Sequence, residues 1–301
     1  MKKFNKIMSL VLILIIFLGT VNVYAYSNLH NEMQSLINED GSKILKAENL
    51  KNLEELHNYI SNNISRYVIK NQDGTVTISK QIYKINISPY LIKKYITMID
   101  EINKGVKLGI IYFDKNLSAQ VIDDVENYVY NRRNNTLKEY MNNYSTKDVG
   151  IMSLPDEPPY FNITYTCHKN AKELQDVYDA AEATRIINPN VNPWLVTVGY
   201  WVGKVREGGD WDYKRELGWN TEYKIIIGGK VDYVYGEDIG NIHYGYTGRS
   251  VGFSQVTLKS AAGLVQVLSG TAKKEWFNSY FDDPKDQYAI QRGIDMYNNG
   301  L

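Results

Sequence analysis

The sequence predicts an α+β fold, in which a mainly helical N-terminal domain precedes a mostly helical C-terminal domain with a small β-hairpin. Two observations predict this class. Apolar residues recur at spacings of three and four along several segments of both halves, which is typical of helices with one buried face. In the C-terminal half, two β-prone runs flank the pair Gly228-Gly229, which predicts a hairpin.

The start of the chain has the pattern of a secretory signal peptide. Three lysines precede the apolar run 11–18, and Val23 and Ala25 occupy the small-residue positions of a cleavage site. An uncleaved anchor is the alternative, but the run is shorter than the roughly 20 residues that a spanning helix needs. No later segment is apolar enough to span a membrane. We therefore expect cleavage after Ala25 and a secreted, extracellular protein with no stable membrane anchor.

Composition bounds the class of protein. Removing the three lysines of residues 1–25 leaves 31 basic and 34 acidic residues, a net charge near −3. This argues against non-specific nucleic-acid binding through bulk charge, although it leaves room for a local basic patch. The single cysteine, Cys167, excludes an intramolecular disulfide. The core must therefore hold the fold, and the mature length suits two domains.

The first half, residues 26–144, reads as mainly helical and contains nothing that resembles a site. A helix is predicted over residues 50–64, a hairpin turns at Asp73-Gly74, and Ser88-Pro89 opens a helix to about residue 103. A strand follows at 107–113, and Ser118 is expected to cap a long helix through Val129. A pro-segment, a targeting module and an inhibitory domain all suit this region.

Three prolines within five residues predict an exposed linker at 145–160. The domain at 161–301 then contains helices over 170–187 and from Pro193 onward, followed by the Gly228-Gly229 hairpin. Ser254 caps a helix through Leu268. Asp283 and Pro284 open the last helix, which ends before Gly300.

The stretch Glu237–Phe253, "EDIGNIHYGYTGRSVGF", is the first candidate site, and we interpret it as a loop between the hairpin and a helix. Its glycines allow positive φ and close approach of a ligand. His243 suits proton transfer near neutral pH. Glu237 and Asp238 could transfer a proton or orient a partner. Asn241 could hold a substrate amide or an oxyanion, and Arg249 could bind a phosphate or a carboxylate. A structural turn with a surface histidine is the alternative.

Two further clusters carry polar residues. In "REGGDWDYKREL", the ring of Trp211 could stack on a base or a sugar, and Lys214 near Asp212 could stabilise negative charge that develops during a reaction. The alternative is a capped helix start with Trp211 in the core. In "FDDPKDQYAI", Asp283 and Asp286 fit a helix cap and its first turn better than metal ligands. No metal-ligand or cofactor motif occurs, so we expect neither a metal nor a cofactor.

The order of "WDYK", "GNIHYGYTG" and "DDPKD" resembles the bacterial polymorphic toxin type 44 domain over about residues 160–300. The resemblance implies a toxin effector with an immunity protein as a partner, and ribonuclease as the suggested activity. The positions that match its motifs are Trp211, Asp212, Lys214, Gly240, Asn241, Tyr244, Gly245, Gly248, Asp283, Pro284 and Asp286.

The sequence is therefore compatible with three functions. A metal-independent ribonuclease would use His243 with a nearby acid, and Lys214 or Arg249 on the phosphate. A peptidoglycan or glycan hydrolase would use Glu237 and Asp212 across Trp211, and a secreted protein meets the cell wall before it meets RNA. A non-enzymatic binding domain is the third. We also expect the three motifs to meet on one face.

Overall fold

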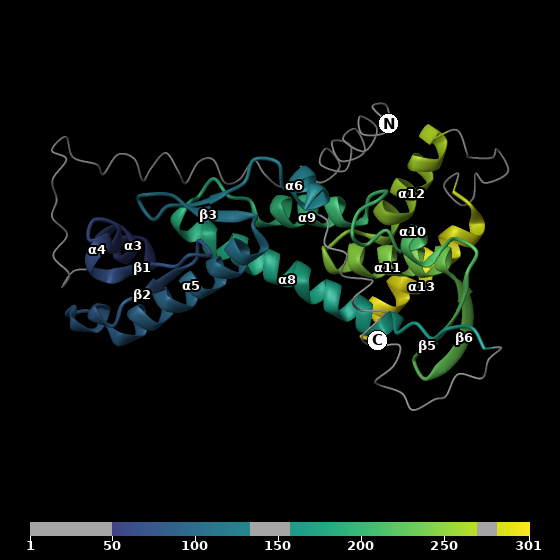
Figure 1. Cartoon of the computed structure of the whole chain (residues 1–301), viewed down its shortest axis with the longest axis horizontal. Helices are drawn as coiled ribbons and strands as arrows, with labels where there is room; N and C mark the ends of the chain where they lie inside the picture. The colour runs from purple at the N-terminus through teal and green to yellow at the C-terminus, as the bar shows by residue number, and fades with distance from the viewer. Residues whose placement is uncertain (1–49, 133–156, 270–281) are drawn as a thin grey trace. The chain divides into compact units, whose positions relative to one another are not determined.

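The computed structural model describes residues 50–132, 157–269 and 282–301, with side chains described up to residue 263 in the helix that ends at Ser269 (Figure 1). The fold is α+β and mostly helical, which confirms the predicted class. One compact unit comprises Ala47–Phe253 and Tyr288–Leu301, and a second contains the described part of Ser254–Gln287. The division of the chain at the proline-rich linker stays a prediction. The signal peptide lies outside the described residues, as does most of that linker.

The N-terminal elements follow local signals in the sequence. Asn52 caps the first helix by accepting a hydrogen bond from the Glu55 amide. Pro89 opens α5, and Gly109 ends it in a left-handed conformation with φ 75°. The elements are α3 (Leu53–Ser61), α4 (Ile64–Tyr67), β1 (Val68–Lys70), β2 (Val76–Ile78), η4 (Lys80–Lys84), α5 (Pro89–Leu108), β3 (Ile111–Phe113), β4 (Ala119–Val121) and α6 (Val125–Asn131).

The long helix predicted from Ser118 is wrong. Residues 119–121 pair as β4 with β3, with Ile111 opposite Val121, and the following helix begins only at Val125. The Asp114 carboxylate accepts hydrogen bonds from the amides of Asn116 and Ser118, which fixes the turn of this hairpin. A local turn thus overrides the helical spacing of the apolar residues.

The C-terminal half contains the predicted helices and hairpin. The strands pair from Glu222 opposite Tyr235 to Ile227 opposite Lys230. Gly228 and Gly229 both have positive φ, as a tight hairpin turn requires. The elements are α8 (Ile163–Ile187), α9 (Pro193–Val205), α10 (Tyr213–Leu217), β5 (Glu222–Ile227), β6 (Lys230–Tyr235), α11 (Gly236–Ser250), α12 (Gln255–Ser269) and α13 (Pro284–Asn298).

The predicted loop at 237–253 is wrong, because residues 236–250 form the helix α11. Its glycines have negative φ and serve close packing instead. A Cβ on Gly245 would lie 2.2 Å from the carbonyl oxygen of Ile290, and one on Gly240 would lie 2.5 Å from Cγ of Lys214. Glycine therefore lets α11 approach α13 and α10 more closely than any other residue would allow.

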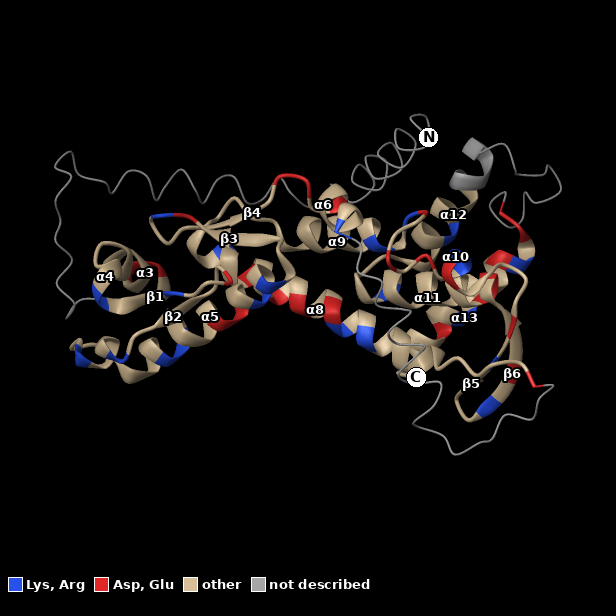
Figure 2. Cartoon of the chain, viewed as in Figure 1, with Lys and Arg blue, Asp and Glu red and all other residues tan. Residues whose placement is uncertain are grey.

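The helix α8 is the centre of the larger unit. It packs against α5 and α9, and its N-terminal half contacts α11 (Figure 1). Basic and acidic residues both occur along α8 (Figure 2). The helix α6 packs on α9, where a Cβ on Gly203 would lie 2.5 Å from the Glu126 carbonyl oxygen. Among the described residues, no helix combines the length and apolar character needed to cross a bilayer.

Candidate functional site

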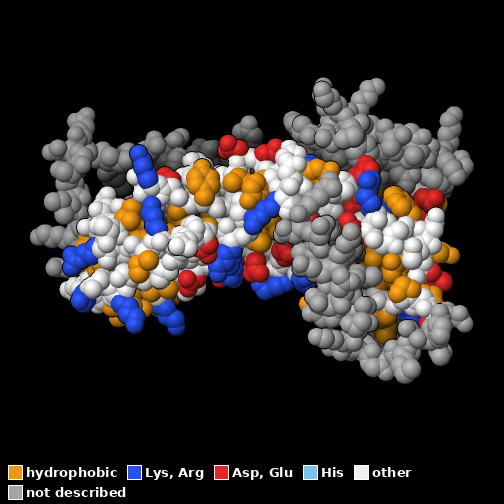
Figure 3. Space-filling model, in the orientation of Figure 1, with side chains coloured by type: hydrophobic (Ala, Val, Ile, Leu, Met, Phe, Trp, Pro, Cys, Tyr) orange, Lys and Arg blue, Asp and Glu red, His pale blue; other side chains and the backbone are white. Residues whose placement is uncertain are grey.

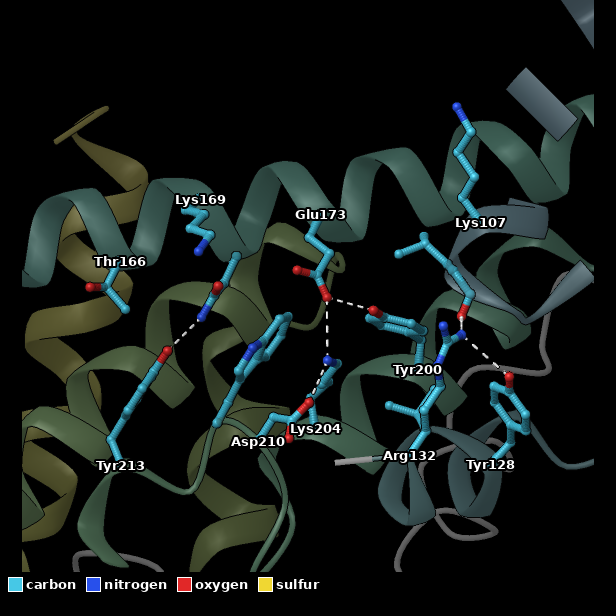
Figure 4. A pocket seen from close by; sticks show the side chains of 14 residues that line it. Lys107, Tyr128, Arg132, Thr166, Lys169, Glu173, Tyr200, Lys204, Asp210 and Tyr213 are labelled. Carbon is cyan, nitrogen blue, oxygen red and sulfur yellow. Dashed lines mark hydrogen bonds and ion pairs between the residues drawn. The ribbon is translucent and has the colours of Figure 1, made fainter. Parts of the chain in front are cut away.

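A pocket of about 180 Å³ opens in the larger unit, where helices from both halves of the chain meet (Figure 4). Its walls come from the end of α5, from α6, from one face of α8, from α9, and from the turn leading into α10. The lining residues are Lys107, Leu108, Tyr128, Val129, Arg132, Thr166, Lys169, Asn170, Glu173, Tyr200, Lys204, Asp210, Trp211 and Tyr213. Four of these are cationic and two are acidic.

The face of α8 in this pocket follows from helix geometry. Thr166, Asn170 and Glu173 are spaced by four and three residues, so they lie on one side of the helix. Lys169 and Glu173, one turn apart, both point toward the residues of the opposite wall (Figure 4). An ammonium and a carboxylate thus stand side by side on a rigid element.

An ion network crosses the pocket. The Lys204 ammonium lies 2.7 Å from Oδ2 of Asp210 and 3.5 Å from Oε1 of Glu173, so one cation joins two carboxylates (Figure 4). The Tyr200 hydroxyl donates to the same Glu173 oxygen. Burial of Tyr200, followed by the charge of Glu173, raises the pKa of its phenol far above the usual range, so this phenol remains a hydrogen-bond donor.

The glycines before Asp210 explain its position. Gly208 has φ 71°, and a Cβ on Gly209 would lie 2.3 Å from the Lys204 carbonyl oxygen. The chain therefore folds back on the end of α9, where the Trp211 amide donates to that same oxygen. This tight turn places the Asp210 carboxylate, whose side chain is 4% exposed, on the Lys204 ammonium.

The opposite wall holds a guanidinium. Arg132 donates from Nη1 to the Leu108 carbonyl oxygen at 2.7 Å and to the Tyr128 hydroxyl at 3.3 Å, which ties the end of α6 to the end of α5 (Figure 4). Lys107 lines the same wall. Arg132 thus faces Glu173 and Lys169 from the C-terminal half, whereas the Lys107 ammonium points away from them (Figure 4).

A buried histidine supports the back of the pocket. The Asn170 amide donates to the Tyr213 hydroxyl at 2.8 Å and lies 2.9 Å from Nε2 of His243. Because an amide N–H donates, Nε2 is the acceptor and Nδ1 carries the proton. The His243 ring meets the rings of Trp211 and Tyr213 edge-on, with centroids 5.4 and 4.7 Å away.

His243 is fully buried, which contradicts its expected position in an accessible loop. Burial lowers its pKa to about 3, so the imidazole is neutral near pH 7. Its Nδ1 has no hydrogen-bond partner among the described residues. The side chain lies behind the pocket wall rather than in it, and its role as a catalytic base stays a prediction.

Of the site residues predicted from the sequence, Trp211 alone is among the residues that line the pocket. It is buried, as the core alternative expected. Asp212 precedes α10 and accepts a hydrogen bond from the Gly208 amide at 2.7 Å. Lys214 runs over Gly240 of α11, and its ammonium lies 5.6 Å from the centroid of the Trp219 ring. These side chains support the turn and the packing of α10.

The predicted residues of α11 are engaged within the fold. Asp238 caps the helix by accepting from the Tyr235 amide at 2.9 Å. Asn241 is buried, and Tyr244 packs on Trp201 with ring centroids 5.3 Å apart. Arg249 donates to the Phe253 carbonyl oxygen and to the Asn298 side chain. Glu237, half-buried, stands in the first turn.

The third motif lies at the start of α13, in the smaller unit. Pro284 is the first residue of that helix, as predicted, and Asp283 accepts a hydrogen bond from the Lys285 amide. Asp286 stands in the first turn and is buried. The expectation that this motif meets the other two on one face stays a prediction. Within the described part of the chain, no cluster of three or more His, Cys, Asp and Glu side chains is arranged to hold a metal ion.

The comparisons with known proteins give a class. Residues 200–299 match the model of the family "Bacterial toxin 44", which confirms the resemblance seen in the motifs for that part of the chain. The match covers α10, the hairpin, α11, α12 and α13, and it supports a toxin-like effector as the class of protein. No curated protein and no solved structure matches the chain significantly.

Proposed function

We propose that the chain is a toxin-like hydrolase that cleaves RNA, and that the pocket between α5, α6, α8, α9 and α10 holds the phosphodiester. One observation carries the proposal: four cationic side chains and two carboxylates line one pocket, although the chain as a whole has no excess of positive charge. The cations outnumber the carboxylates by two, and a cleft with an excess of one sign of charge attracts ligands of the opposite sign.

The cations have distinct geometries for this task. Arg132 presents a planar guanidinium that is held in place by the Leu108 carbonyl oxygen, and such a fork matches two oxygens of a phosphate. Lys169 presents a point charge from α8. The Lys204 ammonium is already neutralised by Asp210 and Glu173, so we assign it to holding the Glu173 carboxylate rather than the substrate.

Glu173 is the proposed general base. Its carboxylate takes the proton of the ribose 2′-hydroxyl as the 2′-oxygen bonds to phosphorus. The bond from phosphorus to the 5′-oxygen breaks, and the leaving oxygen takes a proton from the Lys169 ammonium. The products are a 2′,3′-cyclic phosphate and a free 5′-hydroxyl. Positioned acids and bases of this kind contribute roughly 10²–10⁴ in rate each.

His243 has a positioning role in this proposal. Its neutral ring accepts from the Asn170 amide and so holds that side chain in the pocket wall. Direct catalysis by His243, Asp212, Lys214 or Glu237 remains a separate hypothesis. Secretion after cleavage at Ala25 and neutralisation by an immunity protein belong to the same proposal. The pattern of residues 1–25 supports the cleavage, and the toxin class supports the immunity protein.

A cell-wall glycan hydrolase is the second candidate, and one observation favours it. Glu173 and Asp210 lie on the same ammonium, at 3.5 and 2.7 Å, beside the aromatic walls of Trp211 and Tyr200. Glycoside hydrolysis uses a pair of carboxylates on either side of the bond that breaks. The two candidates share the pocket and differ in the polymer that enters it.

The test uses residues 26–301, because a fragment that starts near residue 160 lacks α5 and α6 and with them one wall of the pocket. The purified chain is incubated with RNA and with peptidoglycan, and the products are analysed for cyclic phosphates and for new sugar ends. The matched variants are Glu173→Gln and Asp179→Asn, which both neutralise a carboxylate on α8. Cleavage of RNA that only Glu173→Gln abolishes supports the proposal. Release of sugar ends alone favours the glycan candidate, and an inert wild-type chain refutes both.

A further inference from the structure

The surface formed by η4 and the first turns of α5 carries an uninterrupted positive charge. Between Asp73 and Asp100 the chain has no acidic residue and four lysines. All four are exposed, and none forms an ion pair with any residue that the structure describes. These lysines are Lys80, Lys84, Lys93 and Lys94. The start of α5 accordingly shows basic and no acidic colour in Figure 2, and basic side chains project there in Figure 3.

Two tyrosines project from the same surface. Tyr83 is 61% exposed and Tyr90 is 67% exposed. The Lys94 ammonium lies 4.8 Å from the centroid of the Tyr90 ring. Below them, Ile82 and Tyr95 are fully buried, so the exposed side chains stand on a fixed scaffold. Rings with an apolar body and a polar hydroxyl, next to long lysine stems, are amphipathic on the scale of a lipid head group.

We infer that this lysine and tyrosine surface binds anionic lipid membranes. The charge complements phosphate-bearing head groups, and tyrosine prefers the boundary between hydrocarbon and water. Recognition of RNA relies more on arginine, whose planar fork pairs with phosphate and stacks on bases. The stretch from residue 74 to residue 99 contains no arginine.

The surface is separate from the pocket proposed above. None of its four lysines lines that pocket, whereas Lys107, further along α5, does. On its other side it borders a groove that Lys93 and Lys94 share with Glu101, Asp179 and Glu182, so the positive charge ends there. Membrane binding can therefore be removed by mutation without touching the proposed catalytic groups.

The experiment measures binding of residues 26–301 to vesicles of phosphatidylcholine, with and without phosphatidylglycerol, by co-sedimentation. The variant K80Q/K84Q/K93Q/K94Q removes the surface charge. The variant K51Q/K70Q/K115Q/K230Q removes the same charge from exposed lysines elsewhere. Each lysine near an anionic membrane strengthens binding roughly fivefold, so the first variant should bind more than about a hundredfold more weakly. Circular dichroism checks that both variants fold.

Three results support the inference: preference for phosphatidylglycerol, loss of binding in the first variant alone, and weaker binding of Tyr90→Ser with an unchanged salt dependence. Equal binding to both kinds of vesicle overturns it, as does equal loss in the two quadruple variants. Binding of single-stranded RNA by the same lysines, without binding to anionic vesicles, overturns it in favour of a nucleic-acid surface.

Discussion

The pocket and the helix α11 are both rich in polar residues, yet they use them in opposite ways. In α11, the residues that suggested a site are buried, capped or paired within the fold. Its Gly245 meets the backbone of α13, and its Gly240 meets Lys214 of α10. In the pocket, charged side chains from four helices face one cavity. The polar residues of α11 are close in sequence and stabilise one helix, whereas the polar residues that line the pocket come from segments far apart in the sequence.

This difference shows what a dense motif can mean. The spacing of small and polar residues in "GNIHYGYTG" fits a helix that must approach others closely and satisfy buried polar groups. Its histidine supports the pocket from behind through Asn170. We therefore interpret α11 as a scaffold behind the proposed site, whose proposed reacting groups, Glu173 and Lys169, lie on α8.

The largest expected effect is on Glu173. The substitution Glu173→Gln keeps the shape of the side chain and removes its ability to take a proton. If this carboxylate is the general base, kcat falls by roughly 10²–10⁴. Rates of RNA cleavage by the purified chain measure this. Asp179→Asn on the same helix should retain activity within about threefold of the wild type on the same scale.

A second measurement guards against a merely structural effect. Glu173 accepts from Tyr200 and pairs with Lys204, so Glu173→Gln also alters that network. A melting temperature near that of the wild type, together with lost activity, assigns a chemical role to the carboxylate. Full activity in this variant would move the reacting groups away from the pocket, back toward Asp212 and Lys214.

Phosphate binding by Lys169 gives the next effect. Lys169→Ala should raise KM by roughly 10-fold, because one charge-assisted contact to phosphate contributes about 1–3 kcal/mol. It should also lower kcat by roughly 10²–10⁴, because the leaving oxygen loses its proposed proton donor. The slope of binding against salt should fall by about one. Lys172→Ala is the control, since Lys172 pairs with Asp176 one turn along α8 and does not line the pocket. Equal effects of the two variants would contradict a specific phosphate contact.

Sequence patterns predicted most of the helices and the C-terminal hairpin because their signals are local. Pro89, Pro193 and Pro284 all stand at the first position of a helix, as predicted. The pocket could not be predicted in the same way, because it depends on how α5 and α6 pack on α8 and α9. Its local trace in the sequence is the spacing of Thr166, Asn170 and Glu173 on one face of a long helix.

The loop predicted at α11 shows where a local sequence pattern predicts the wrong structure. Gly240, Gly245 and Gly248 were interpreted as loop residues because glycine allows positive φ and close approach of a ligand. Their partners are in other segments: Ile290 carries the carbonyl that Gly245 faces, and Lys214 covers Gly240. Close contacts between helices override a local propensity of about 1 kcal/mol per glycine, and no single-segment pattern reveals them.

Packing of α11 is tested by Gly245→Ala. A Cβ there would lie 2.2 Å from the Ile290 carbonyl oxygen, so α11 and α13 must move apart. We expect the free energy of unfolding to fall by roughly 1–3 kcal/mol, as measured by chemical denaturation. Gly199→Ala is the control: its Cβ would meet Val125 at 3.4 Å, an ordinary contact, and helix propensity favours alanine there. A stable Gly245→Ala variant would mean that residue 245 lies in an open loop after all.

The last prediction concerns the pH dependence that buried histidines impose. Burial lowers the pKa of His243 from 6.5 to about 3 and that of His57 to about 4. The unfolded chain therefore takes up protons as pH falls through about 6.5, while the folded chain does not. Stability is fully present above that pH and is lost on acidification toward the folded pKa values. Each histidine contributes a slope of up to about 1.4 kcal/mol per pH unit.

Most carboxyl groups stay ionised between pH 6.5 and 5, so the slope of the unfolding free energy against pH in this range comes mainly from His243 and His57. His243→Gln should remove about half of that slope, even if it also changes the unfolding free energy itself. Denaturation at several pH values measures it, and His57→Gln provides the matched control with the same expected change. Because His243 is neutral throughout this range, the wild-type pH profile of kcat/KM should show no ionisation that His243→Gln abolishes. A limb near pH 6.5 that disappears in this variant would identify His243 as a proton-transferring group, and the pocket would then have to open toward α11 during catalysis.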